Sequence, residues 1–275
     1  MKIDAHQHFW KYSPQRDTWI DDSMQVLKKD YLPADLCAIL SKNEIDGCIA
    51  VQADQSEVET QFLLNLANEN PFIKAVVGWV DLCADNIEER LAYFSKYPKF
   101  KGVRHIVQAE ADDFLLQENF QHGIAKLKKF NLVYEILIRK EQLASVIAFV
   151  AKFPEQIFVL DHLAKPNIKD AEVTLWRHQI QQLAKFPNVY CKVSGMVTEA
   201  DWNAWKYENF VPYLDVVFEA FGTERLLFGS DWPVCLLASN YDNVLTIMEK
   251  YISKLPEQQQ QNIMGATATK IYNLK

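Results

Sequence analysis

At 275 residues, with 49% hydrophobic and 24% charged side chains, the chain is long enough to bury one large core or two modest ones. Its formal net charge of −7 argues against nucleic acid or an anionic membrane as a partner, because both usually select basic patches. The first residues lack the basic and then apolar pattern of a signal peptide, and no run approaches the ~20 apolar residues of a membrane span. The five cysteines are scattered and include no CxxC pair, so we expect a reduced, cytoplasmic protein.

Short β-branched runs alternate with longer amphipathic ones along the whole chain, without a Pro-, Gly- or Ser-rich linker between them. The runs that predict strands are 2–8, 46–53, 72–80, 100–107, 132–139, 156–163, 188–194 and 226–230. Apolar residues recur at helical spacing between them, which predicts helices over 56–70, 86–97, 120–130, 140–153 and 171–186.

The number and order of these elements favour one fold. The run 157–160 is continuously apolar, as expected of a parallel sheet that is covered on both faces. Eight βα units in a chain of this length predict a single (β/α)8 TIM-barrel domain over residues 1–275. A doubly wound open sheet is the alternative, but the glycine-rich first turn that it often uses to bind phosphates is missing.

Two segments depart from the repeating pattern. Residues 9–32 are rich in aromatic and charged side chains and have no clear helical period. Loops of that length are usually functional, and in a barrel this one follows a strand at the rim where active sites form. The segment 257–272 predicts an additional helix packed on the outside of the barrel.

A barrel brings the polar residues that end its strands to one common mouth. His6 and His8 in the first strand are two residues apart, so both imidazoles should point to the same face. Asp231 follows the last strand, and a carboxylate that meets two imidazoles can activate water. The other polar residues at the predicted strand ends are Gln52, Asp54, Trp79, Asp81, Arg104, His105, Glu135, Arg139, Asp161, His162, Lys165, Lys192 and Ser194.

Four of the six histidines fall at these strand ends, whereas His122 and His178 lie in predicted helices and are expected at the surface. A single histidine is more often a core residue with satisfied ring nitrogens than a functional one. Clustering of this kind is hard to explain by chance, and we interpret four residues as the catalytic set: His6, His8, His162 and Asp231.

Several residues around this set are candidates for binding substrate, each with a structural alternative. An arginine at a strand end can simply pair with an internal carboxylate, rim lysines are often merely solvated, and rim tryptophans can cap the barrel. The predicted substrate-binding residues are Trp10, Gln52, Arg104, Arg139, Lys165 and Trp232. His105 should point away from Arg104 if the strand is regular, and Trp202 and Trp205 could form a lid.

Four strings of the sequence together resemble those of a known family: Asp4-Ala5-His6-Gln7-His8-Phe9-Trp10, Lys101-Gly102-Val103-Arg104-His105, Asp161-His162 and Gly229-Ser230-Asp231-Trp232-Pro233. The chain is similar to the amidohydrolase superfamily, in the amidohydrolase-2 branch that contains lactone hydrolases of sugar acids and of a pyrone dicarboxylate. The strings run from the first strand to the last, so the resemblance covers essentially the whole predicted barrel. It implies a hydrolase with a site at the barrel mouth.

Many members of that superfamily hold zinc or another divalent ion, and the resemblance implies which residues would do so here. The fifth strand, 132–139, contains neither the histidine nor the lysine that serves as a ligand in such members. Arg139 cannot replace it, because a guanidinium has no free lone pair. The remaining candidate ligands for a single ion are His6, His8, His162 and Asp231. We expect that no cofactor is required, with at most one zinc or other divalent cation bound.

The sequence therefore favours a lactonase that acts on a small sugar-acid lactone. In this hypothesis Asp231 is the general base and the three histidines polarise the carbonyl, while Arg104 orients the substrate, helped by Arg139 or Lys165. The alternative is a metal-dependent decarboxylase or hydratase that acts on an aromatic or unsaturated acid. A catalytically silent binding module is less consistent with the sequence, because a binder has no need of a general base. The sequence does not indicate an oligomeric state.

Overall fold

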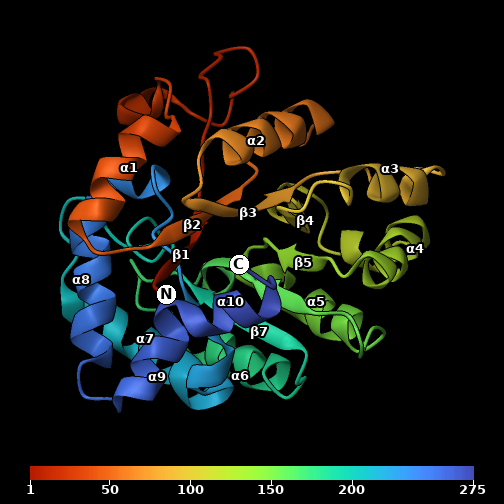
Figure 1. Ribbon diagram of the computed structural model, residues 1–275. Coiled ribbons are helices and arrows are strands. Elements are labelled where there is room, and N and C mark those ends of the chain that lie inside the picture. Colours follow the sequence, from red (N-terminus) through yellow and green to blue (C-terminus); the bar gives the residue numbers. More distant parts are fainter.

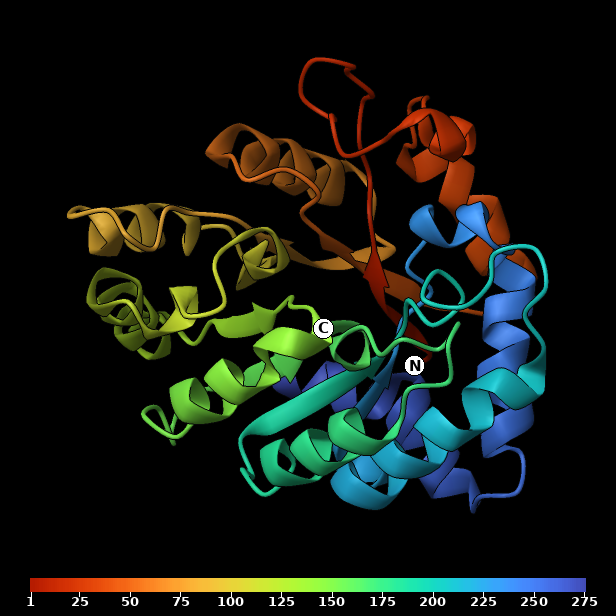
Figure 2. The ribbon, with the colours of Figure 1, turned by 180° about the vertical axis from the view of Figure 1, so that it is seen from behind.

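The computed structural model describes residues 1–275 and forms a barrel of parallel strands surrounded by helices (Figures 1 and 2). Neighbouring strands in the sheet are also consecutive in the sequence, from β1 to β8. The strands are β1 (Ile3–Gln7), β2 (Gly47–Val51), β3 (Ile73–Gly78), β4 (Phe100–His105), β5 (Val133–Ile136), β6 (Phe158–Leu160), β7 (Val189–Val193) and β8 (Leu226–Phe228). The predicted (β/α)8 barrel is confirmed, and an open doubly wound sheet is excluded.

A helix follows each strand and packs its apolar face against the sheet. The helices are α1 (Pro33–Lys42), α2 (Glu57–Glu69), α3 (Ile87–Phe94), α4 (Glu118–Leu127), α5 (Leu143–Val150), α6 (Thr174–Leu183), α7 (Tyr207–Phe221) and α8 (Tyr241–Ile252). In α2 the Ser56 side chain accepts a hydrogen bond from the Glu59 N–H and so caps the first turn. Leu63, Leu64 and Ala67 then fall on one buried face at helical spacing. No helix ranges were predicted for α1, α7 and α8.

Two apolar clusters hold the barrel together. The larger one contains 70 buried residues and fills the layer between strands and helices. The smaller one contains 13 residues and includes Ile3, Val51, Val133 and Leu227, whose side chains fill the inside of the barrel. Both clusters are continuous, so the strand ends at the mouth rest on a packed base.

The strands β1 and β8 close the barrel through the residues that follow β8. The Asp231 N–H donates to the His6 carbonyl at 2.8 Å, and the His8 N–H donates to the Trp232 carbonyl at 2.7 Å. Gln7 and Trp232 form a parallel bridge at the same place. The first and the last of the four strings, 4–10 and 229–233, are therefore adjacent in space.

The loop 9–32 turns back on itself above β1, where it projects from the barrel in Figure 1 (red). Trp10 and Tyr31 exchange backbone hydrogen bonds of 3.0 and 2.9 Å, and their rings meet edge to face. Between them a 3-10 helix, η1 (Asp22–Leu27), gives the loop internal structure that the sequence pattern did not indicate.

The C-terminal segment corrects one prediction. Residues 257–272 form three short pieces in place of one outer helix: α9 (Glu257–Gln261), a π-helical turn η9 (Asn262–Ala266) and α10 (Thr267–Ile271). Ala268, Tyr272 and Leu274 belong to the cluster inside the barrel, so the segment closes the end opposite the mouth. The bottom of the barrel exposes apolar side chains that need a cover, and the apolar residues of this segment provide it.

No helix of the structure is both long enough and apolar enough to cross a bilayer. All five cysteines are free in the structure. The cytoplasmic location and the exclusion of nucleic acid stay predictions.

Candidate active site

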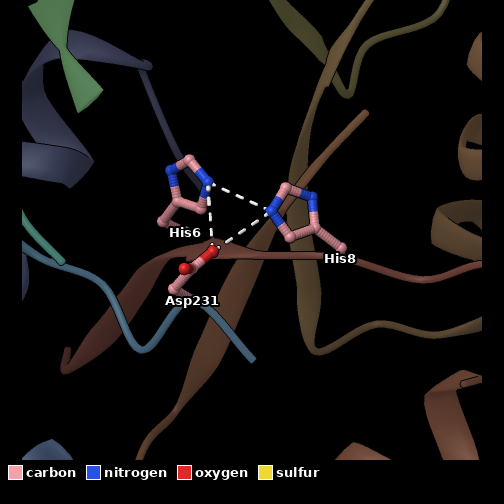
Figure 3. Close-up of side chains that lie close together, drawn as sticks. All are labelled: His6, His8 and Asp231. Carbon is pink, nitrogen blue, oxygen red and sulfur yellow. Dashed lines mark hydrogen bonds and ion pairs between the residues drawn. The ribbon is translucent and has the colours of Figure 1, made fainter. Parts of the chain in front are cut away.

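The centre of the site is a group of three side chains at the mouth, His6, His8 and Asp231 (Figure 3). The Nε2 atoms of the two imidazoles are 3.2 Å apart. The Asp231 Oδ1 lies 3.4 Å from the His8 Nε2 and 3.8 Å from the His6 Nε2. The prediction that the imidazoles of His6 and His8 point to one face and meet the carboxylate after β8 agrees with this arrangement.

The hydrogen bond of His8 to the backbone fixes its protonation pattern. Its Nδ1 lies 2.8 Å from the Val51 carbonyl, which can only accept a hydrogen bond. The Nδ1 atom therefore carries the proton, and in the neutral ring the Nε2 atom offers a lone pair toward Asp231 and His6. His8 is thus an acceptor on the side that faces the mouth.

His162 is the third imidazole of the predicted set, and it lies against the ring of His6 with centroids 4.3 Å apart. Its Nδ1 is 2.9 Å from the Ser194 hydroxyl, and its Nε2 is 4.0 Å from the Asp231 Oδ1. Gly195 makes room for the ring, because a Cβ there would lie 2.6 Å from the His162 Nδ1.

The backbone at two strand ends adopts a left-handed conformation that carries functional side chains. The residues His162, Leu163, Ala164 and Lys165 all have φ between 49° and 60°, and Asp231 has φ of 57°. Such values are unfavourable for residues with a Cβ and concentrate at functional sites, where the surrounding structure enforces them. No glycine marks these positions, so this turn could not be predicted from the residue types.

Asp4 and Ser230 form a buried connection behind the site that the sequence analysis did not identify. The Asp4 carboxylate accepts hydrogen bonds from the Ser230 N–H at 2.9 Å, the Ser230 hydroxyl at 2.6 Å and the His6 N–H at 3.1 Å. The Ser230 hydroxyl in turn accepts from the Trp232 N–H at 3.0 Å. These bonds fix the residues on both sides of Asp231 and hold its left-handed backbone in place. Their place in the first and the last of the four quoted strings was the available signal.

Arg104 reaches the site from β4, but most of its donors are already used. Its Nη1 donates to the Asp161 Oδ2 at 3.0 Å and lies 3.3 Å from the His6 Nε2, while its Nη2 donates to the Gln52 carbonyl. Only the Nε atom lacks a partner. Gln52 is buried and does not line the pocket described below, so it supports Arg104. As predicted, His105 points away from Arg104 and bonds to Glu110.

A layer of buried charges lies beneath the three imidazoles. The Lys192 Nζ forms ion pairs with the Glu135 Oε1 at 2.6 Å and with the Asp161 Oδ1 at 3.3 Å. It also lies 3.2 Å from the His6 Nδ1. From the far side, the Tyr272 hydroxyl donates to the Glu135 Oε1 at 2.5 Å. Lys192 is fully buried, so the alternative of a solvated rim lysine is wrong for this residue.

A pocket of about 330 Å³ opens above the site. Its walls include His8, His162 and Asp231 at the base and apolar side chains around them, and its remaining lining residues are Trp10, Trp19, Ala53, Gln55, Arg104, Ile106, Gln108, Ala109, Leu137, Lys165 and Val234. A larger hollow at the opposite end of the barrel, lined in part by Met1 and Lys270, contains none of the predicted site residues.

The predicted substrate-binding residues divide into two groups. Trp10, Arg104 and Lys165 line the pocket, and Trp19 adds a half-exposed ring beside Trp10. Gln52, Trp232 and Arg139 are not among its walls: the first two are buried behind it, and Arg139 is exposed at the start of the segment before α5.

Neither Trp202 nor Trp205 lines this pocket. Their ring N–H groups donate to the Thr198 and Ala238 carbonyls instead of covering the mouth.

Burial and nearby charges set the protonation states. Burial and the Lys192 ammonium lower the pKa of His6 well below its ordinary value, so the ring is neutral. Burial alone would raise the pKa of Asp231, but His162, His8 and Lys165 outweigh it and hold that pKa below 3.8. The site at neutral pH therefore contains an ionised Asp231 carboxylate beside the neutral ring of His6.

The three central side chains also fit a zinc ion. Zinc bonds of ~2.0–2.1 Å in a tetrahedron separate the ligand atoms by roughly 3.4 Å. The three ligand atoms are separated by 3.2, 3.4 and 3.8 Å, so His6, His8 and Asp231 could hold the metal together. His162 does not belong to this group of three but forms a second one with His6 and Asp161.

Fold and site define a (β/α)8-barrel enzyme with a histidine and aspartate centre at the mouth. The sequence model of the amidohydrolase family matches residues 3–274, and the chain belongs to this family. It is 41% identical over 286 residues to an L-fucono-1,5-lactonase of Burkholderia multivorans (strain ATCC 17616 / 249), covering 100% of this chain and 96% of the relative. A second L-fucono-1,5-lactonase, from Burkholderia ambifaria (strain ATCC BAA-244), is 34% identical over 241 residues, covering 87% and 83%.

Solved structures agree with these likenesses. A crystal structure of an amidohydrolase from Burkholderia multivorans with bound zinc matches with a TM-score of 0.97 and 41% identity over 100% of both chains. A dihydroxybenzoic acid decarboxylase from Polaromonas sp. JS666 with bound manganese reaches a TM-score of 0.70 at 13% identity, covering 99% and 96%. The second likeness shows only a shared fold, so the decarboxylase alternative is a distant one.

Proposed function

We propose that this protein hydrolyses the lactone of a sugar acid to the free acid, with Asp231 as the general base. The observation that carries this proposal is the position of the Asp231 Oδ1 between three imidazole Nε2 atoms, 3.4, 3.8 and 4.0 Å away, at the base of the pocket. The likeness to two L-fucono-1,5-lactonases over most of the chain supports a sugar-acid lactone as the substrate class.

Asp231 and His8 together position the attacking water. The ionised carboxylate accepts one water proton, and the lone pair of the His8 Nε2 accepts a hydrogen bond from the other. The two acceptors are 3.4 Å apart, so one water between them can direct an oxygen lone pair at the lactone carbonyl. Asp231 takes the first proton as the new C–O bond forms.

His6 and His162 lie on the other side of Asp231 and stabilise the oxyanion that develops on the carbonyl oxygen. Their role is hydrogen-bond donation in a site shielded from water, where each donor is typically worth ~10²–10³ in rate. The Arg104 guanidinium, 3.3 Å from the His6 Nε2, adds positive potential at this point. When the tetrahedral intermediate collapses, the ring C–O bond breaks and protonated Asp231 returns its proton to the alkoxide.

A divalent ion held by His6, His8 and Asp231 would supply a Lewis acid and lower the pKa of a bound water. The residues of the chain already provide a base, a water acceptor and two oxyanion donors, so we expect hydrolysis without a metal. The pocket residues Trp10, Trp19 and Lys165 would contact the sugar. The apolar C–H face of a sugar ring packs well against aromatic rings such as those of Trp10 and Trp19.

A pH-indicator screen of sugar-derived 1,4- and 1,5-lactones, with and without chelator and with metal content verified, tests the proposal. We expect opening of at least one lactone that survives removal of the metal and is lost in D231N. If no lactone is opened and an aromatic acid loses carbon dioxide instead, the decarboxylase alternative is correct. Loss of all lactone opening on chelation, with recovery on adding zinc, would contradict the metal-independent route.

A further inference from the structure

Gln55 lies in the turn that joins β2 to α2 and lines the pocket above the site. Its side-chain Oε1 accepts a hydrogen bond of 2.7 Å from the backbone N–H of Ile106, the residue after β4. A backbone N–H only donates, so the amide atom that faces it is the oxygen and not the nitrogen. This contact therefore fixes the orientation of the Gln55 amide, with its Nε2 amino group on the side away from Ile106.

The turn that carries Gln55 is itself held in place by side chains. The buried Glu59 carboxylate accepts hydrogen bonds from the N–H of Ala53 at 3.0 Å and from the N–H of Asp54. The Ser56 hydroxyl donates to the Asp54 Oδ2 at 2.7 Å and accepts from the Glu59 N–H at 3.2 Å. A group that is fixed before a ligand arrives loses little conformational freedom on binding it. Gln55 is therefore preorganised for binding.

The Nε2 amino group of Gln55 is a free donor at the pocket wall. It carries two N–H groups and makes no hydrogen bond within the protein, whereas the Oε1 of the same amide is occupied. It is not one of the polar atoms that are fully enclosed without a partner, so a ligand in the pocket can reach it. The amide therefore offers a hydrogen bond to an oxygen atom of a bound ligand.

The charges around the pocket indicate which kind of oxygen this donor suits. The arginine and the lysine of the pocket are both paired with carboxylates: Arg104 with Asp161 at 3.0 Å, and Lys165 with Glu199 at 3.8 Å. The ionised Asp231 carboxylate adds a negative charge at the base. A ligand carboxylate would meet this charge with no unpaired lysine or arginine to offset it, whereas a neutral hydroxyl would not. The uncharged amide donor therefore suits a hydroxyl oxygen.

We propose that Gln55 is a specificity-determining residue whose Nε2 amino group donates a hydrogen bond to one hydroxyl oxygen of the sugar-acid lactone. This role rests on the proposed function, because it takes a hydroxylated lactone as the ligand of the pocket. A site that hydrogen-bonds a substrate OH rejects the analogue that lacks it, since its own polar group is then left without a partner. Gln55 thus selects among lactones by the position of a hydroxyl, whereas Asp231 acts at the carbonyl that all lactones share.

Calorimetric binding of galactono-1,5-lactam and its monodeoxy derivatives tests the proposal, because an N–H in place of the ring oxygen resists hydrolysis. We expect the wild type to bind at least one monodeoxy derivative about tenfold more weakly than the parent lactam. Q55M should bind the parent about tenfold more weakly and treat this pair alike within about twofold. Q55E keeps the oxygen that accepts from the Ile106 N–H, and a hydroxyl can donate to its carboxylate, so this variant should still distinguish the pair.

A second measurement uses the wild-type side chain. In ¹⁵N-labelled wild-type protein, the Gln55 side-chain amide signals, assigned with Q55E, should shift when the parent lactam binds. Unchanged signals at saturation with the parent lactam overturn the proposal, whether or not Q55M folds. Q61M is the matched control, because Gln61 lies on α2 outside this pocket and bonds to Asn65 and Tyr97. Its lactam affinities should equal those of the wild type within about twofold.

Three calorimetric results would overturn the proposal: no lactam binding by the wild type, undiminished discrimination in Q55M against every derivative, or tighter wild-type binding of the 6-carboxylate analogue than of the parent lactam. None of these measurements requires turnover. Lactam binding that depends on Gln55, in a protein that opens no lactone, would support this role of Gln55 and contradict hydrolysis. Lactone opening with lactam binding that ignores Gln55 would contradict this role alone.

Discussion

The two sides of the His6 ring open onto two regions of opposite character. At the mouth, Asp231 and His162 sit on left-handed backbone and line the pocket. Beneath the ring, Lys192 and Glu135 lie on regular strands and neutralise each other at 2.6 Å. The mouth holds reactive groups in an unfavourable conformation, and the buried charge layer supplies the rigid base that keeps them there. Substitutions in the first region should change chemistry, and those in the second should change stability.

The largest effect is expected at Asp231. D231N keeps the size and the left-handed backbone tolerance of the residue but removes the base, and a general base is worth ~10²–10⁴ in rate. We expect kcat for lactone opening to fall at least ~100-fold with the melting temperature nearly unchanged. Turnover close to that of the wild type would assign the base to another residue.

Gly195 offers a way to displace His162 without removing it. The G195A variant places a Cβ 2.6 Å from the His162 Nδ1 and strains a residue at φ of 65°. Misplacing a reacting group by about 1 Å can cost ~100-fold, so we expect kcat to fall by about 10–100-fold. G222A is the matched control, since Gly222 has φ of 68° with open space around it. Similar losses of activity in both variants would show that strain alone, not the position of His162, is responsible.

A substitution at Ser230 tests whether its hydrogen bonds to Asp4 support catalysis at the mouth or only the stability of the barrel. S230A removes two buried hydrogen bonds, which should cost about 1–3 kcal/mol in the free energy of unfolding. Because Asp231 follows directly, we also expect kcat to fall by about tenfold. S95A serves as the control, because the Ser95 hydroxyl is buried without a partner. A loss of stability with unchanged kcat would show that Ser230 stabilises the barrel and does not position Asp231.

Tyr272 probes the buried charge layer at its far end. Y272F removes the hydrogen bond to Glu135, and we expect the free energy of unfolding to fall by about 1 kcal/mol in denaturant titration. The kcat/KM for lactone opening should stay within about twofold of the wild type. A larger loss of activity than of stability would show that the two regions are not separable.

The pH dependence of activity gives the smallest expected change. The pKa of Asp231 is held below 3.8, and a lowered pKa keeps the carboxylate ionised as the pH falls. We therefore expect kcat/KM, corrected for spontaneous hydrolysis, to stay flat from pH 7 down to about pH 5. An acidic limb with a midpoint near pH 6 would indicate a histidine as the base.

The sequence predicted the barrel and the main site because both depend on local rules. The spacing of His6 and His8 on a strand, and the position of Asp231 after the last one, determine where these side chains point. The connection of Asp4 to Ser230 was not visible, because it joins residues 226 positions apart through atoms that no periodicity marks. The depth of Lys192 and the turn after β6 also escaped prediction, since strand alternation gives a face but neither burial nor backbone handedness.

The closure of the barrel by β1 and the end of β8 has a consequence for folding. Every contact between His6 or His8 and Asp231 joins segments more than two hundred residues apart, and contacts of such long range tend to form slowly. A barrel that lacks its last strand would contain both histidines and no activity at all. Recovery of lactone opening during refolding should therefore follow the formation of the helices and report the moment at which the ring of strands closes.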